Sequence, residues 1–257
     1  MKDQLNRVLH LEKIPKRIVC LVPSQTELLC DLGLKPFIVG VTKFCVHPSD
    51  IKSKAQVLGG TKQINFDTLK ALQPDIILCN KEENTKAIVD VCETICPVHV
   101  SDVFDLNDSY KLIEQYGTLF KVEQIAAAII TKIQYEFEAF QSYIKNKPYL
   151  NTLYFIWKSP WMIAGQNTFI NYLLALNKFK NYTKVTRYPE IELKQDENIA
   201  LVLLSSEPYP FKSNHIRELE AFYPKANILL VDGEMFSWYG SRLTKAFNYF
   251  KALHARL

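Results

Sequence analysis

Cys45 and His47 come nearest to a metal site among the residues of this sequence. Both can donate to a soft or borderline metal ion, and Glu82 and Glu83 could add carboxylate oxygens. Two donors do not complete a site, because structural zinc takes four protein ligands and catalytic zinc takes three. We therefore assign no metal site and expect His47 to line a cleft or to order a loop. His99 lies inside a predicted strand, where we expect it in the core.

The sequence lacks the motifs of nucleophilic and nucleotide chemistry. A nucleophile elbow needs G-x-S-x-G, and the nearest stretch, Trp238–Arg242, holds one glycine. Ser241 within it is better explained as the N-cap of the last helix. Gly59–Lys62 lacks the remaining spacing of a Walker phosphate loop, and no G-x-G-x-x-G occurs. We therefore assign no catalytic residue and no cofactor.

Aromatic side chains gather in loops of the second half of the chain. All three tryptophans (Trp157, Trp161 and Trp238) lie at or after the ends of predicted strands, and Tyr239 follows the last of them. Ligands of parallel α/β sheets bind at the carboxyl ends of strands, so these loops are candidates for a site that takes a large flat or apolar ligand. Arg242, at the start of the last predicted helix, suits either an anionic group of that ligand or a surface salt bridge.

The first half of the chain has candidates at equivalent positions, and all of them except Phe44 are polar. Ser24 and Gln25 follow the first predicted strand, and Lys43, Phe44 and His47 follow the second. Since the carboxyl ends of parallel strands share one edge of the sheet, we expect these five side chains to belong to the ligand site.

Strand-like and helix-like segments alternate along most of the chain, which indicates parallel sheets with helices on their faces. The first helix is expected to begin with a capping box formed by Ser24 and Glu27. The predicted strands cover residues 17–22, 36–42, 75–80, 98–100, 152–157, 200–205 and 227–232. The predicted helices cover residues 24–33, 67–72, 85–95, 121–145, 168–176, 213–222 and 241–257.

The segment Lys121–Lys145 interrupts this alternation. It contains neither glycine nor proline, its apolar residues recur every three or four positions, and Pro148 follows it. A helix of about 25 residues is roughly 37 Å long at about 1.5 Å per residue. We therefore predict an α/β lobe over residues 1–116, a bridging helix over 117–148 and a second α/β lobe over 149–257.

Composition and charge are those of an ordinary globular protein, with 48% apolar and 23% charged residues. The net charge of +4 is spread along the chain, and the densest basic stretch, Lys13–Arg17, is short, so we expect no nucleic-acid binding.

Charged residues interrupt the first 20 positions, so we expect no secretory signal there. Cys20 and Cys79 lie in apolar strands, which favours reduced, buried thiols and the reducing conditions of a cytoplasm.

A set of motifs resembles the helical-backbone metal and cobalamin receptors of ABC importers. In that family the order is R-I-V-S-L-x-P-S-x-T-E…L-G, then V-G-V-T…C-x-x-P, then V-G-G…E-x-I…L-x-P-D. The corresponding residues here lie between about residue 15 and residue 105: Arg17–Ser24, Thr26, Glu27, Leu32–Leu34, Val39–Thr42, Cys45, Pro48, Val57–Gly60, Asp67, Leu69 and Leu72–Asp75.

The resemblance implies two Rossmann-like lobes joined by one long helix, as in class III periplasmic binding proteins. It implies a metal chelate held in the cleft between the lobes (cobalamin, haem or a ferric siderophore), delivery to an ABC permease, and no catalysis. We expect a monomer. The implied ligand contacts are Ser24, Gln25, Lys43, Phe44, His47, Trp157, Trp161, Trp238, Tyr239 and Arg242.

Receptors of this kind are docked on the permease by one acidic residue on each lobe. Asp67 stands at the first of these positions. Lys194 stands near the second, where Glu190 or Glu192 could substitute for it. Two alternatives stay open: a cytoplasmic binding or carrier protein on the same fold, and a tetrapyrrole-handling enzyme, since metal-insertion enzymes share a two-lobed α/β plan.

Overall fold

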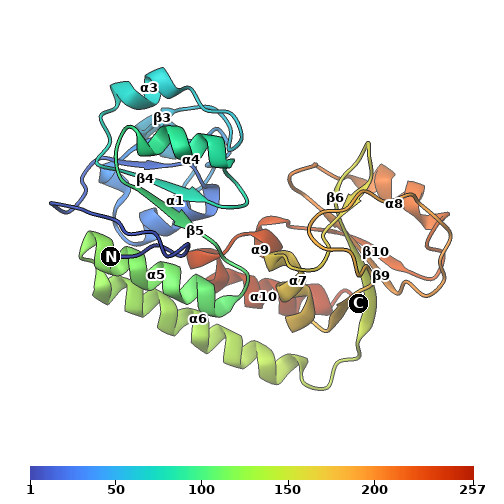
Figure 1. Ribbon diagram of the computed structural model, residues 1–257. Coiled ribbons are helices and arrows are strands. Elements are labelled where there is room, and N and C mark those ends of the chain that lie inside the picture. Colours follow the sequence, from blue (N-terminus) through green and yellow to red (C-terminus); the bar gives the residue numbers. More distant parts are fainter. The chain divides into compact units, whose positions relative to one another are not determined.

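Figure 1 shows the computed structural model, which describes all residues from 1 to 257. The chain divides into two compact units. Unit 1 is Met1–Ile133 with Tyr239–Arg242, and unit 2 is Gln134–Trp238 with Leu243–Leu257. Each unit contains one sheet of largely parallel strands with helices, so the predicted two-lobed α/β fold is confirmed. No helix combines the length and the apolarity that crossing a bilayer requires.

The sheet of unit 1 has five parallel strands in the order β3-β2-β1-β4-β5. Its two central neighbours, β1 and β4, are completely buried, as expected for apolar strands covered on both faces. The order reverses between them, and the carboxyl ends at such a reversal are where ligands bind in open α/β sheets. The strands are β1 (Ile18–Cys20), β2 (Ile38–Val41), β3 (Gln56–Val57), β4 (Ile76–Asn80) and β5 (Val98–Ser101).

The expected capping box at the start of the first helix is wrong. Helix α1 (Pro23–Asp31) has Val22 at its N-cap, and no side chain caps it. Proline suits the first helical position, because its missing N–H would have no partner there. Ser24 lies within the helix and is buried, and the Glu27 carboxylate pairs with Arg242. The other helical elements up to residue 93 are η1 (Lys35–Phe37), α2 (Ile51–Lys54), α3 (Phe66–Ala71) and α4 (Lys86–Glu93).

Helix α5 (Leu106–Phe120) was absent from the predicted elements. Asp105 caps it by accepting a hydrogen bond from the Asp108 N–H at 2.9 Å. One face is buried, with apolar residues three or four positions apart. The cap residue and the periodicity are both visible in the sequence and would have predicted this helix.

Helix α6 (Glu123–Ile144) corresponds to the predicted helix over 121–145, and the chain passes from unit 1 to unit 2 within it. Lys121 separates it from α5, since its left-handed backbone (φ 58°) ends the earlier helix. Gly117 allows the two helices to pack closely, because a Cβ there would lie 2.8 Å from the Ala126 Cβ.

Unit 2 has strands in the order β10-β9-β6-β7, with β8 paired to β6. All pairs are parallel except β6 with β7. Its strands are β6 (Leu150–Trp157), β7 (Met162–Ile163), β8 (Phe179–Asn181), β9 (Leu201–Ser205) and β10 (Asn227–Val231). The helices are α7 (Phe169–Leu176), α8 (Ser213–Glu220), α9 (Glu234–Ser237) and α10 (Leu243–His254), and the short 3-10 helix η2 (Gly240–Arg242) belongs to unit 1.

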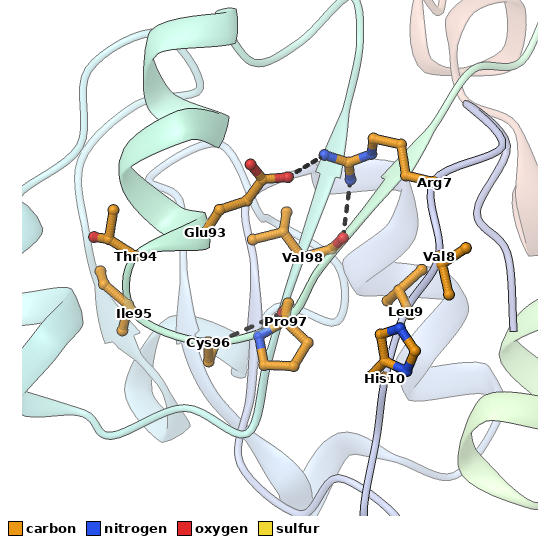
Figure 2. A pocket seen from close by; sticks show the side chains of 10 residues that line it. All are labelled: Arg7, Val8, Leu9, His10, Glu93, Thr94, Ile95, Cys96, Pro97 and Val98. Atoms are coloured by element: carbon orange, nitrogen blue, oxygen red, sulfur yellow. Dashed lines mark hydrogen bonds and ion pairs between the residues drawn. The ribbon is translucent and has the colours of Figure 1, made fainter.

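The N-terminal segment covers the outer edge of strand β5. Asp3 Oδ2 accepts a hydrogen bond from the Val100 N–H at 3.1 Å, and Arg7 Nη2 donates to the Val98 carbonyl oxygen at 2.9 Å. Figure 2 shows Arg7 bonded to both the Val98 carbonyl and the Glu93 carboxylate. These side chains satisfy backbone groups that an open sheet edge would expose.

Candidate ligand-binding site

Gln25 forms the centre of a buried hydrogen-bond network in unit 1. Its Nε2 group donates to Ser101 Oγ at 2.5 Å and to the Tyr239 hydroxyl at 3.0 Å, and its Oε1 accepts from the Tyr116 hydroxyl at 2.6 Å. Burial raises the pKa of both tyrosines, which keeps them neutral. Gln25 therefore ties together the start of α1, the end of β5 and helix α5, and the residue before η2.

The turn after β4 is ordered by two buried asparagines. Asn80 Oδ1 accepts from the backbone N–H groups of Glu82 at 2.8 Å and Glu83 at 3.1 Å. Asn84 Oδ1 accepts from the Asn80 N–H at 2.9 Å, and its Nδ2 donates to the Thr61 carbonyl at 3.0 Å. Burial raises the pKa of the Glu83 carboxyl. The turn follows a strand at the reversal point of the sheet, and it contains Glu82 and Glu83, the two carboxylates considered above as possible metal donors.

The loop after β2 presents a cation and a ring to solvent. Lys43 Nζ lies 5.1 Å from the centre of the Phe44 ring, and half of Phe44 is exposed. Val46 is exposed as well, and His47 is half-buried. An exposed apolar cluster beside a lysine suits a ligand that has a flat face and an acidic group.

Cys45 points inward from the same loop. Its Sγ lies 3.2 Å from Thr26 Oγ1 and 3.3 Å from Thr42 Oγ1, and burial raises its pKa, which keeps the thiol protonated. No group of three or more His, Cys, Asp and Glu side chains is arranged to hold a metal ion. His99 is in the core, as predicted, packed edge-on against the Tyr116 ring.

Arg242 forms a buried salt bridge with Glu27, with 2.8 Å between Nε and Oε2. The sequence left a choice between a ligand anion and a surface salt bridge, and the observed ion pair is internal to unit 1. Ser241 lies within η2, and helix α10 begins two residues later, so the expected N-cap at Ser241 is wrong. Gly240 (φ 82°) turns the chain into this position, and its N–H donates to Ser109 Oγ at 3.0 Å.

The carboxyl end of β6 in unit 2 carries a cluster of aromatic rings. Trp157 is 39% exposed and packs edge-on against Tyr209, with 5.6 Å between ring centres. Trp161 is stacked on Phe211 at 6.0 Å, and Lys158 Nζ lies 5.1 Å from the Trp161 ring centre. Tyr209 and Phe211 follow β9, whose carboxyl end lies at the same edge of the sheet.

Trp238 is buried, and its side chain joins two loops of unit 2. The indole Nε1–H donates to Glu207 Oε1 at 3.0 Å, and the Ser237 hydroxyl donates to the same oxygen at 2.7 Å. The loop after β9 is thereby fixed to the segment after α9. The ten predicted ligand residues thus fall into buried members (Ser24, Gln25, Trp238, Tyr239 and Arg242) and members with solvent exposure (Lys43, Phe44, His47, Trp157 and Trp161).

The two predicted docking residues are exposed. Asp67 lies in the first turn of α3 in unit 1. Glu192 lies in the coil between β8 and β9 of unit 2, where its carboxylate is 3.4 Å from Lys194 Nζ.

A cavity of about 410 Å³ lies between the N-terminal segment and the turn from α4 to β5 (Figure 2). Pro97, just before the amino end of β5, lines it, whereas Ser101 lies at the carboxyl end of that strand. Two of its charged side chains, Arg7 and Glu93, are paired with each other. The cavity is therefore separate from the loops described above.

Known proteins resemble this chain over much of its length. An uncharacterized ABC transporter substrate-binding lipoprotein of Bacillus subtilis, YvrC, is 29% identical over 189 residues, which cover 70% of this chain and 59% of that protein. A vitamin B12-binding protein of Pectobacterium carotovorum is 26% identical over 48% of this chain and 45% of its own length. The chain thus spans about half the length of these two relatives.

Among solved structures, a periplasmic heme-binding protein from Pseudomonas aeruginosa superposes with a TM-score of 0.81 at 21% identity, over 93% of this chain and 92% of that one. At this identity the likeness establishes the shared fold. Residues 18–201 match the family described as periplasmic binding protein. Since the match covers well over half of the sequence, the chain belongs to the periplasmic binding protein family.

Proposed function

We propose that the protein binds a metal chelate (cobalamin, haem or a ferric siderophore) and delivers it to an ABC importer. The observation that carries this proposal is the same in both units: a loop after a sheet strand presents an aromatic ring with a lysine ammonium above it. In unit 1 these are Phe44 and Lys43, and in unit 2 they are Trp161 and Lys158, whose ammonium also pairs with the Glu218 carboxylate. Such pairs suit chelates that combine a large apolar face with carboxylate or phosphate groups.

The predicted ligand residues take two roles in this proposal. The exposed or half-buried ones, Lys43, Phe44, His47, Trp157 and Trp161, contact the ligand. The buried ones hold the contacting loops in place through the hydrogen bonds described above. Rigid support of this kind lowers the entropic cost of ordering a site when the ligand binds.

Membership of a family of binding proteins supports binding without turnover, so the proposal includes no catalytic residue. The name of the Bacillus subtilis relative supports an ABC permease as partner. We propose that the carboxylates of Asp67 and Glu192 contact this permease, because both are exposed and each lies on its own unit. The proposal needs a single copy of the chain, since both loops belong to it.

The test is spectroscopic titration of the purified chain with cyanocobalamin, haemin and a ferric catecholate. We expect one of them to bind with a Kd below about 10 μM, which corresponds to roughly −7 kcal/mol. Mass spectrometry of the recovered ligand should show it unchanged. If none of the three binds in this range, the chelate proposal is wrong. If a bound chelate is chemically converted, the protein is an enzyme and the proposal of binding without turnover is wrong.

A further inference from the structure

We propose that unit 2 carries a second binding site, specific for a small hydroxylated phosphate ester. The site is a pocket of about 380 Å³ between strand β8, helix α7 and the residue before β6. The side chains that carry the inference are Tyr149, Asn171, Lys178, Lys180, Asn181 and Lys184.

This pocket lies far from the aromatic loops of the same unit. Tyr149 precedes β6, and Trp157 ends it. Eight extended residues span about 23 Å at roughly 3.3 Å per residue, so the pocket and Trp157 lie at opposite ends of the strand. The pocket can therefore bind a ligand whether or not the aromatic loops bind a chelate.

Lysines give the pocket a positive charge that no acidic lining residue balances. Lys178 is held in place, since its Nζ donates to the carbonyl oxygens of Lys145 at 2.6 Å and Lys147 at 3.0 Å. Lys180 and Lys184 are exposed, form no ion pair, and line the same pocket. No aspartate or glutamate lines it. Three lysines thus line one hollow, and the two exposed ones have ammonium groups available to attract a dianion such as a phosphate ester.

The side-chain amides of Asn171 and Asn181 indicate that the ligand also carries a hydroxyl group. Asn181 is 6% exposed, and its Nδ2 donates to the Ala164 carbonyl and to Asn171 Oδ1, both at 3.0 Å. These two bonds fix its orientation and leave Asn181 Oδ1 as a buried acceptor without a hydrogen-bond donor. An unsatisfied buried acceptor costs free energy, which a donor from a ligand would recover.

A ligand that meets both conditions carries a phosphate group and a hydroxyl group a few bonds apart. The phosphate would pair with the lysines and with the Asn171 Nδ2 group, and the hydroxyl would donate to Asn181 Oδ1. Glycerol phosphate has this chemistry: the free monoester is a dianion, and the headgroup of phosphatidylglycerol keeps the phosphate and the hydroxyl as a diester with one negative charge.

The test is calorimetric titration of the full chain with glycerol 3-phosphate, with inorganic phosphate and glycerol titrated separately. We expect glycerol 3-phosphate to bind at least about fivefold more tightly than inorganic phosphate, because it alone supplies both groups. Lys180→Ala combined with Lys184→Ala should weaken binding about tenfold, as expected when charge-assisted contacts are lost. Both side chains are exposed, so this variant should keep its fold.

The matched control is Lys194→Ala combined with Lys225→Ala, which removes the same charge from two exposed lysines of unit 2 outside the pocket. Equal weakening in both double variants would show a general charge effect and overturn the proposal. So would the absence of binding below about 10 mM, or about −2.7 kcal/mol. Vesicles of phosphatidylglycerol that bind with the same dependence on Lys180 and Lys184 would identify a lipid source, while binding of the soluble ester alone identifies a free metabolite.

Discussion

Arg242 Nε lies 2.8 Å from Glu27 Oε2 in unit 1, and less than a tenth of either side chain is exposed. The two residues are 215 positions apart in the sequence. Helix α1 supplies the glutamate, and the short η2 turn brings the arginine back to unit 1 between two stretches of unit 2. The ion pair therefore fixes a distant part of the chain against the first helix of the fold.

Replacing Arg242 with methionine should destabilise unit 1 by about 3–5 kcal/mol, because Glu27 would keep a buried charge without its partner. The combined variant with Glu27→Gln should recover part of this loss. Chemical denaturation, with hydrogen exchange of the α1 amides, measures the effect in unit 1. The control is Lys86→Ala, which breaks an exposed ion pair with Asp90 on α4. If Arg242→Met lowers stability no more than the control does, the pair does not hold the turn.

His254 should make the stability of unit 2 depend on pH. Burial, assisted by the nearby Lys147 ammonium, lowers its pKa from 6.5 to about 4. Its ring is stacked on Phe179, with 4.9 Å between ring centres. Between pH 6.5 and pH 4 this histidine is protonated in the unfolded chain and neutral in the folded chain. The free energy of unfolding therefore falls as the pH falls.

The expected loss from this histidine is about 2–3 kcal/mol over that range. The variant His254→Phe should lose less stability than the native chain over the same pH range, and the comparison cancels the titration of carboxylates common to both proteins. The variant His10→Gln, at an exposed position, should keep the native pH dependence. Identical pH profiles for His254→Phe and the native chain would contradict the assignment.

Much of the fold could be predicted because its signals are local. The apolar runs of β1 and β4 mark strands buried on both faces, and the unbroken stripe of α6 marks a long helix. Strands β7 and β8 have two and three residues, too few to establish a period, so they were not predicted. Their positions depend on pairing with β6, which is a tertiary contact.

For the candidate side chains, the positions after strands could be predicted and the degree of burial could not. The rule that ligands bind at the carboxyl ends of strands selected Phe44 and Trp157, both of which are exposed. The same rule selected Gln25 and Tyr239, which are buried against each other although 214 positions separate them. No local pattern contains such a contact, so the sequence could not separate the residues that touch solvent from those that support the loops.

Trp157 is the sharpest test of the binding surface in unit 2. Trp157→Ala should weaken binding of the chelate about tenfold or more, because the chelate would lose its contact with an exposed aromatic ring. The thermal midpoint should change little. Trp161→Ala should lower the midpoint, since that ring is stacked on Phe211. The control is Tyr135→Ala on α6, which removes a ring that is 69% exposed. Unchanged affinity in Trp157→Ala would place the ligand elsewhere.

Reversing the charge of Asp67 and Glu192 should uncouple transport from binding. Both carboxylates are exposed, and the Lys194 ammonium 3.4 Å from Glu192 contributes little to its stability because exposed ion pairs are weak. Glu192 can therefore exchange this lysine for an arginine or lysine of a permease. The double variant Asp67→Lys and Glu192→Lys should bind the chelate as the native chain does, because neither residue lies in the aromatic loops.

In proteoliposomes that contain the cognate importer, the same double variant should reduce chelate uptake and the stimulation of ATP hydrolysis at least about tenfold, as expected when opposite charges become like charges across an interface. The control, Asp90→Lys, reverses another exposed carboxylate of unit 1 and should leave uptake unchanged. Glu190→Lys tests the neighbouring exposed glutamate in unit 2. Loss of uptake in Glu190→Lys and not in Glu192→Lys would assign the permease contact to Glu190. Full uptake by the double variant would exclude Asp67 and Glu192 from docking.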